Sequence, residues 1–206
     1  MNIDPAAITH AELHRFMIGV VIPRPIAWVS TIGADGRHNL APFSFFNAIA
    51  SQPPLLIVSI NERADGPKDT LRHIRETKDF VINLVDEPLM QRMVETSGEW
   101  APEVDEFALT QLTPAPSERV KSPRVAEAPV SMECALERIL DFESTSLVIG
   151  RMVWGCCRED LLTDGRVDAL KLRPVARLGG DGYTVVREVI RMQRPRAPKP
   201  DAARDG

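Results

Sequence analysis

The feature that most constrains the fold is a series of strand-like segments separated by only short helical ones. Residues 130–137 alternate apolar and polar side chains, the period of a half-buried antiparallel strand. Residues 55–60 form a continuous apolar run, which predicts a strand buried on both faces. Further strands are predicted at 26–32, 80–85, 147–156 and 183–186. Because strands and long helices do not alternate regularly, the sequence predicts a mainly β fold with added helices (α+β), in the form of a β-barrel.

Capping signals predict three short helices between these strands. Thr9 followed by Glu12 is a capping-box pattern in front of an amphipathic stretch at 10–18. Asp69 is expected to cap a second helix, and Asp86 to start a third. The helices are too short to form a layer of their own.

The 206 residues contain no internal repeat and no clean linker, so one domain is expected. Turn chemistry at 33–36 predicts a β-hairpin. Residues 97–129, proline-rich and weakly periodic, predict a long irregular excursion, a kind of connection that often carries function. The domain is placed at 1–193, and 194–206 is expected to form a flexible tail rich in Pro and Arg.

Composition argues against several classes of partner. A net charge of −4 gives no basic surface for nucleic acid. No apolar stretch approaches the roughly 20 residues of a membrane span, and residues 1–14 lack the pattern of a signal peptide, so no membrane association and a cytoplasmic location are expected. Three cysteines, with Cys156 and Cys157 adjacent, argue against a disulfide framework, and Cys134 is expected to be a small core residue.

Candidate nucleophiles and metal ligands are few. His10 and His14 share a face of the first predicted helix but lack the His-Glu-x-x-His order of metalloproteases. His38 and His73 stand alone and are expected to be exposed, so no metal site is predicted. No serine lies in a Gly-x-Ser-x-Gly elbow and no cysteine in a reactive motif. The sequence gives no support to hydrolysis through a nucleophile.

Lys68, Asp69 and Thr70 form the strongest candidate for anion binding. At the start of a helix, free backbone N–H groups, an ammonium and a hydroxyl can converge on one phosphate dianion. The alternative is that Asp69 only caps the helix while Lys68 is exposed. Ser30 and Thr31, near the end of a strand, carry the same two interpretations: phosphate ligands, or hydroxyls that satisfy backbone groups.

Five segments, in order, carry a family resemblance. They are 23–31 (PRPIAWVST), 39–47 (NLAPFSFFN), 68–74 (KDTLRHI), 80–85 (FVINLV) and 172–180 (LRPVARLGG). Together they resemble the flavin reductase-like family with the FMN-binding split barrel. The similarity extends over about residues 10–186.

The resemblance implies a homodimer of split β-barrels that binds FMN, with FAD as the alternative, at the subunit interface. NADH or NADPH is the implied reductant. The cofactor-binding positions expected from the resemblance and from the phosphate chemistry above are Ser30, Thr31, Ala41, Pro42, Ser44, Phe46, Asn47, Ser59, Lys68, Asp69, Thr70, Arg177, Gly179 and Tyr183.

The implied activity is that of an NAD(P)H-dependent flavin reductase. Hydride passes from nicotinamide to flavin and then to a flavin, monooxygenase, iron or quinone acceptor; the flavin does this chemistry, so no catalytic acid or base is assigned. One alternative is a non-catalytic flavin-binding electron carrier, because residues 144–146 read Ser-Thr-Ser where many relatives carry a histidine. Another is a split-barrel oxidase of a small amine. Arg24 either reaches an anion or only holds the start of the first strand.

Overall fold

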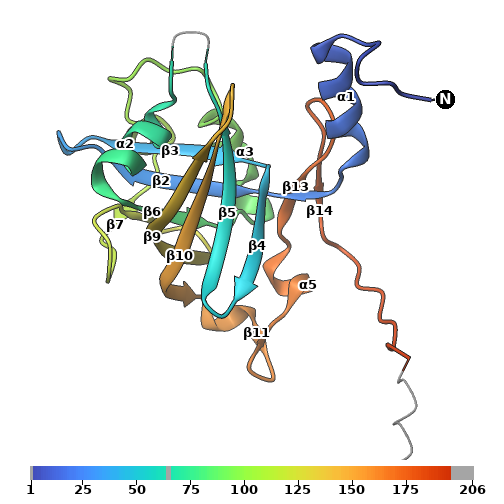
Figure 1. Cartoon of the computed structure of the whole chain (residues 1–206). Helices are drawn as coiled ribbons and strands as arrows, with labels where there is room; N and C mark the ends of the chain where they lie inside the picture. Colours follow the sequence, from blue (N-terminus) through green and yellow to red (C-terminus); the bar gives the residue numbers. More distant parts are fainter. Residues whose placement is uncertain (1, 64–65, 196–206) are drawn as a thin grey trace, which may run out of the picture.

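The computed structural model describes residues 2–63 and 66–195 of the 206-residue chain. Its main sheet has seven antiparallel strands in the order β3-β2-β6-β9-β10-β5-β4 (Figure 1). Their bounds are β2 Ala27–Ile32, β3 His38–Phe43, β4 Phe46–Ser51, β5 Pro54–Asn61, β6 Asp79–Asn83, β9 Val130–Asp141 and β10 Thr145–Cys157. The mainly β fold with added helices is thus confirmed. The predicted tail, from residue 196 onward, lies outside the described residues.

The order of the strands forces the sheet to curl into a barrel. Strands β3 and β4 stand at opposite ends of the hydrogen-bonded order, yet only Ser44 and Phe45 separate them in the chain. Phe43 and Phe46 are three residue steps apart, which span at most about 11 Å, so the two edges must approach each other. The backbone N–H of Ser59 in β5 donates to the carbonyl of Phe45 at 2.8 Å. The connection between β3 and β4 therefore marks the seam of the barrel.

Strand β2 is buried on both faces because a hydrophobic cluster lies on each side of it. Ala27 and Val29 pack into the cluster inside the barrel, with Phe80. Trp28 points the other way, into a second cluster, and its Nε1 donates to the Thr96 hydroxyl at 2.9 Å. The predicted hairpin follows: β2 pairs with β3, and Gly36 in the turn adopts a φ of +83°.

Burial differs from the prediction in strands β5 and β9. Only one face of β5 is fully buried, through Leu56, Val58 and Ile60, so burial on both faces was a wrong prediction. In β9 the polar positions Ser131 and Glu133 are buried as well, because the excursion packs over them. The alternation in sequence placed this strand correctly but misjudged which side chains reach water.

The first two predicted helices are present, and one of their caps differs. Helix α1, His10–Val20, has the predicted capping box with Thr9 and Glu12, although none of its residues is buried. Helix α2, Asp69–Thr77, begins after Lys68, and no side chain caps it. Asp69 was expected to be the cap; it instead lies in the first turn, where Arg72 donates to its carboxylate at 2.6 Å.

The third predicted helix and the excursion together build the second hydrophobic cluster. The helix appears as a 3-10 turn, η1 Glu87–Leu89, followed by α3 Met90–Glu95. The excursion is largely irregular, as predicted, with only short elements, and it buries Phe107, Leu112 and Val125 in the cluster. These elements are α4 Glu106–Leu109, β7 Pro114–Ala115 and β8 Arg124–Val125. The excursion is therefore a packed cover over one face of the sheet.

The C-terminal part adds a small sheet beside α1. Strands β1, β13 and β14 form it, and in Figure 1 the turn between β13 and β14 lies next to α1, to the side of the barrel. Their bounds, with those of the remaining elements, are β1 Arg24–Pro25, η2 Glu159–Leu161, β11 Leu162–Thr163, β12 Arg166–Val167, α5 Ala169–Leu172, β13 Val175–Arg177 and β14 Tyr183–Val185. Within residues 2–63 and 66–195, no helix has the length and apolar character needed to cross a bilayer.

Candidate functional site

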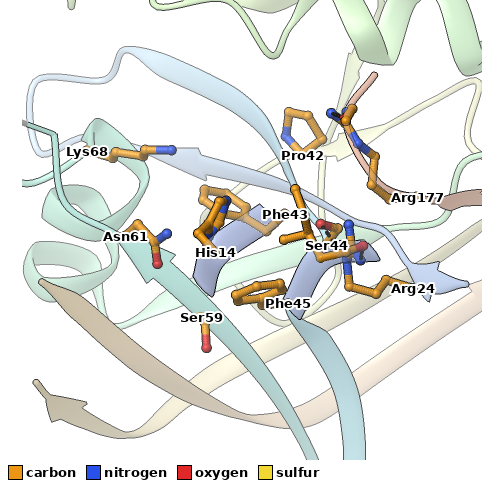
Figure 2. A pocket seen from close by; sticks show the side chains of 12 residues that line it. His14, Arg24, Pro42, Phe43, Ser44, Phe45, Ser59, Asn61, Lys68 and Arg177 are labelled. Atoms are coloured by element: carbon orange, nitrogen blue, oxygen red, sulfur yellow. Dashed lines mark hydrogen bonds between the residues drawn. The ribbon is translucent and has the colours of Figure 1, made fainter. Parts of the chain in front are cut away.

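A groove opens at the seam of the barrel, and three adjoining cavities occupy it. The central cavity, about 220 Å³, lies among residues 42–45, strand β5, helix α1 and the turn after β13 (Figure 2). A polar cavity of about 90 Å³ continues toward α2 and the excursion and shares Pro42, Phe43 and Lys68 with it. An apolar cavity of about 480 Å³ lies at its other end and shares Phe45. The groove thus changes from polar to apolar along its length.

The central cavity carries only positive formal charge. Arg24, Lys68 and Arg177 line it, and none of its described lining residues is Asp or Glu. His14 of α1 adds an imidazole at the rim. In Figure 2, Lys68 and Arg177 lie on opposite sides of the cavity, with Phe43 between them. This distribution favours an anionic ligand that also presents a flat apolar surface.

Lys68 lies at the junction of the central and polar cavities. Its Nζ lies 5.5 Å from the centroid of the Phe43 ring. Burial lowers the pKa of Lys68, the nearby Arg63 lowers it further, and Glu99 opposes this. The ammonium has no hydrogen bond or ion pair with any residue in the described part of the chain. An incoming phosphate would supply the missing partner.

A chain of buried polar side chains supports the wall of the polar cavity. Thr70, 1% exposed, accepts a hydrogen bond from Asn39 Nδ2 at 2.8 Å. Asn39 Nδ2 lies 3.4 Å from the hydroxyl of Thr31, which in turn lies 3.1 Å from Nδ1 of His73. His73 was expected to be exposed but is 3% exposed, and burial lowers its pKa. The network fixes Thr70 where the polar cavity meets α2.

Besides Lys68, the charged residues that line the polar cavity are Arg63, Asp69, Glu99 and Glu106. The Nε of Arg63 is buried and has no hydrogen-bond partner in the described structure. Its Nη1 lies 4.0 Å from the Asp69 carboxylate. Glu106, 8% exposed, accepts a hydrogen bond from the backbone N–H of Leu40 at 3.0 Å. Burial is the main cause that raises the pKa of Glu106 to about 7. The polar cavity therefore combines donors with a carboxyl group that is readily protonated.

Arg24 holds the groove together: its N–H donors are used within the chain, while its positive charge stays in the lining of the central cavity. Its guanidinium donates to the carbonyls of Ile18 and Val21 at 2.7 Å, and to that of Leu178 at 2.8 Å. Its Nε lies 3.4 Å from the Ser44 hydroxyl. Arg24 thus ties the end of α1, the turn after β13 and the connection between β3 and β4 to one another. These hydrogen bonds confirm the interpretation in which Arg24 holds the start of the first strand.

Most of the predicted cofactor-binding residues gather along this groove. Those that line one or more of the three cavities are Ala41, Pro42, Ser44, Phe46, Asn47, Ser59, Lys68, Asp69, Thr70 and Arg177. Tyr183 lies behind them, where its hydroxyl bonds to Arg177. Gly179 packs against α1: a Cβ built on it would lie 3.4 Å from the Cα of Gly19.

Ser30 and Thr31 were predicted to bind the cofactor, and the structure corrects this prediction. Both residues are fully buried and do not line the groove. The Ser30 hydroxyl donates to the carbonyl of Pro123 at 2.5 Å and accepts from Asn83. Thr31 belongs to the network behind Thr70. The alternative interpretation, that these hydroxyls satisfy backbone groups, is confirmed for Ser30, whereas the Thr31 hydroxyl contacts the side chains of His73 and Asn39.

Sequence reasoning missed several polar residues that line the groove, among them His14, Asn61, Arg63 and Glu106. His14 comes from helix α1, which lies before the first of the five motifs, and Glu106 from the irregular excursion. Neither has a local sequence signal, because only the tertiary fold brings them to the seam. Asn61 and Arg63 follow directly after a predicted strand that leads to Lys68, which is a positional signal that was available.

Comparison with known proteins places this groove in a family. The model of the family described as "Flavin reductase like domain" matches residues 19–171. The structure is similar to nitrilotriacetate monooxygenase component B from Bacillus cereus, with a TM-score of 0.89, 36% identity, and coverage of 93% of this chain and 98% of that one. It is also similar to 2-nitrobenzoate 2-nitroreductase from Pseudomonas fluorescens, with a TM-score of 0.88, 33% identity, and coverage of 98% and 100%.

A third structure bears on the fold alone. A protein from Shewanella frigidimarina, described as a flavin reductase with a split barrel domain, has a TM-score of 0.83 at 23% identity and covers 95% of this chain and 100% of that one. The barrel with its seam between β3 and β4 is accordingly the split barrel. Since the family match covers most of the sequence, the chain belongs to the flavin reductase-like domain family.

Proposed function

We propose that this protein is an NAD(P)H-dependent flavin reductase that holds FMN in the groove. The observation that carries the proposal is the order of the three cavities along the groove. A polar cavity with hydrogen-bond donors is followed by a cationic centre and then by an apolar end. FMN has the same order of groups, from phosphate through ribityl chain to ring system. The family and the two similar oxidoreductases support a redox role for the site.

The polar cavity fits the phosphate. Lys68 supplies an ammonium and Arg63 an Nε, neither with a hydrogen-bond partner among residues 2–63 and 66–195, and Thr70 supplies a fixed hydroxyl. The first backbone N–H groups of α2 lie at the same place, where the helix dipole favours an anion. FMN fits this donor set better than a flavin without a phosphate.

The opposite end of the groove fits the ring. Phe45, Phe46 and Ile57 line the apolar cavity, and Ser44 and Asn47 add polar groups at its edge. Flat apolar walls with a few fixed polar groups are typical of sites for cofactors of this kind. When bound, flavin accepts hydride from a nicotinamide and passes electrons on. The protein's residues bind and orient the two reactants, and Arg177 keeps a positive charge beside them.

A second copy of the chain is part of the proposal. Large apolar side chains lie exposed on α1 and beside the seam, among them Phe16, Met17, Val20 and Ile49. Met17 also lines the apolar cavity, which is open to solvent in the single chain. An exposed apolar patch of this kind usually marks an interface. A homodimer that covers α1 would close the apolar end of the groove.

The electron acceptor is proposed to be a flavin or a partner monooxygenase. Support comes from the similarity, at 36% identity over nearly the whole chain, to a protein described as component B of a monooxygenase. A nitroaromatic acceptor is the second candidate, because the 2-nitrobenzoate 2-nitroreductase is 33% identical. Oxygen-free assays with reduced nicotinamide and free FMN, or with 2-nitrobenzoate, distinguish the two.

The experiment that tests the proposal is a visible spectrum of the purified protein with FMN, before and after anaerobic addition of NADH and then NADPH. The expected result is a bound-flavin spectrum that bleaches with at least one nicotinamide. A flavin spectrum that neither nicotinamide bleaches would favour the electron carrier. Failure to bind FMN at all would overturn the proposal.

A further inference from the structure

Glu106 is the most buried of the carboxyl groups that the described residues bring to the polar cavity. It is 8% exposed, while Glu99, which also lines the cavity, is exposed. Only its Oε2 has a hydrogen bond in the described structure, from the backbone N–H of Leu40 at 3.0 Å. Asp105 caps the four-residue helix α4 with its own side chain, so Glu106 is not needed as a cap. Burial of this acid beside Lys68 and Arg63, in a cavity that we propose takes a phosphate, therefore needs another explanation.

The surroundings of Glu106 make its charge state matter to a ligand. Asp69 faces the same cavity from the start of α2, and Asp105 precedes Glu106 in the chain; both raise its pKa, after burial, which is the largest cause. The other charged or titratable groups near it are Lys68, Arg63 and Glu99, which line the cavity, and His38 of β3, whose Nδ1 lies 3.9 Å from Asp105. No cation lies within 4.0 Å of the Glu106 carboxylate in the described structure.

We propose that binding of a flavin phosphomonoester at the polar cavity depends on the protonation of Glu106. The neutral carboxyl admits the phosphate, and the ionised carboxyl opposes it. A protonated carboxyl has one O–H donor, which suits a phosphate oxygen, whereas an ionised one only accepts and carries like charge. The inference rests on the proposed binding of FMN and extends it to the specificity of the polar cavity. Its pKa of about 7 puts the change near neutral pH.

The test is the affinity for FMN and for riboflavin, measured by flavin fluorescence between pH 6 and 8. If only the protonated form binds, the competent fraction falls from about 0.9 to about 0.1, and the dissociation constant for FMN rises about tenfold. Riboflavin, which lacks the phosphate, should show no such rise. In E106Q, whose amide oxygen can still accept from Leu40, the rise should disappear.

Two comparisons remove other causes. E103Q changes an exposed acid three residues earlier in the same segment, and it should keep the tenfold dependence. Titration of the FMN phosphate itself is the same for wild type and E106Q, so their difference isolates Glu106. An equal pH dependence in the two proteins would overturn the inference while leaving the proposed function intact. Absence of FMN binding at every pH would instead count against the proposed function.

A measurement on the wild-type protein guards against misfolding of E106Q. Calorimetric titration with FMN at pH 8, in two buffers of different ionisation enthalpy, counts the protons taken up on binding. The expected value is close to one proton per FMN, since about nine tenths of Glu106 is ionised before binding. Riboflavin should take up none. Proton-neutral binding of FMN would contradict the role given to Glu106.

Discussion

Among single residues, Lys68 carries the most direct prediction. Its ammonium has no partner in the described structure and lies between the polar and central cavities. Lys68→Ala would remove the charged hydrogen bond that we propose between Lys68 and the phosphate, so we expect FMN binding to weaken by about 1.5–3 kcal/mol, or roughly 10- to 150-fold. Lys121→Ala, at an exposed lysine outside the groove, is the matched control. Fluorescence titration gives both values, and equal affinities in the two variants would remove Lys68 from the phosphate site.

Glu106 also predicts how the stability of the flavin-free protein changes with pH. Its pKa is raised to about 7 in the folded chain, above the ordinary value near 4.3, so the folded state binds more protons between these two values. Its contribution to stability is therefore fully present below about pH 4 and is lost as the pH rises through 7, by about 3–4 kcal/mol in all. Urea unfolding should show that, between pH 5 and pH 7.5, the free energy of unfolding of E106Q rises relative to that of the wild type. A constant difference would contradict the raised pKa.

At the scale of the elements, the packing of β10 against β6 makes Gly150 sensitive. A Cβ built on Gly150 would lie 2.4 Å from Cζ of Phe80, and 3.0 Å from the Cβ of Cys134. Gly150→Ala should destabilise the fold by about 1–3 kcal/mol because the core has no room for it. Gly19, inside α1 with nothing within 4 Å of a built Cβ, is the contrast: Gly19→Ala should be neutral, or stabilising by up to about 1 kcal/mol. Denaturant unfolding compares the two.

The excursion depends on a buried carboxylate of β9. Glu133, 0% exposed, accepts hydrogen bonds from the backbone N–H groups of Glu118 at 2.9 Å and Arg119 at 2.7 Å. Glu133→Gln puts an amide N–H₂ against such donors and removes the charge, so we expect a loss of about 1.5–3 kcal/mol in stability. Glu137→Gln, on an exposed stretch of the same strand, should change stability by less than about 1 kcal/mol. Faster proteolysis within 114–125 in the first variant alone is the expected local sign.

How far the sequence could predict each element depended on what surrounds it. The capping box of α1 and the hairpin turn at 33–36 are local signals, and both are confirmed. Strand β4 has no such signal, and no strand was predicted there. It forms because β5 offers it a pairing edge. Burial of Glu133 and His73 depends on distant segments that cover them, which periodicity does not report.

Only part of the candidate site could be predicted, because sequence signals are local and the site also contains residues from distant segments. Lys68 and Thr70 lie in a contiguous motif at the start of a helix, so their proximity follows from the sequence. Ser30 and Thr31 belong to a strand with a hydrophobic cluster on each side, which buries both of their faces. Which hydroxyls reach a groove is decided by the closure of the sheet, and closure brings in Glu106 and His14 from segments without motifs.

For the whole molecule, the exposed apolar face of α1 predicts self-association. Phe16 and Met17 are 42% and 46% exposed, and no residue of α1 is buried, so the helix gains little from its own chain. We expect the wild-type protein to sediment as a dimer, and Phe16→Glu to sediment as a folded monomer, because the charge cannot be buried in an apolar interface. Arg15→Glu, at an exposed position on the same helix, also introduces a carboxylate and should remain a dimer.

The same variants connect assembly to the flavin site. The apolar cavity is lined by Met17 and is open to solvent in the single chain, so a monomer would leave the ring end of the ligand exposed to water. Phe16→Glu should therefore lose affinity for FMN and riboflavin alike, while Lys68→Ala should mainly affect FMN. Sedimentation and fluorescence titration on the same samples test this. A monomeric Phe16→Glu protein with unchanged affinity for both flavins would show that the groove of one chain is sufficient.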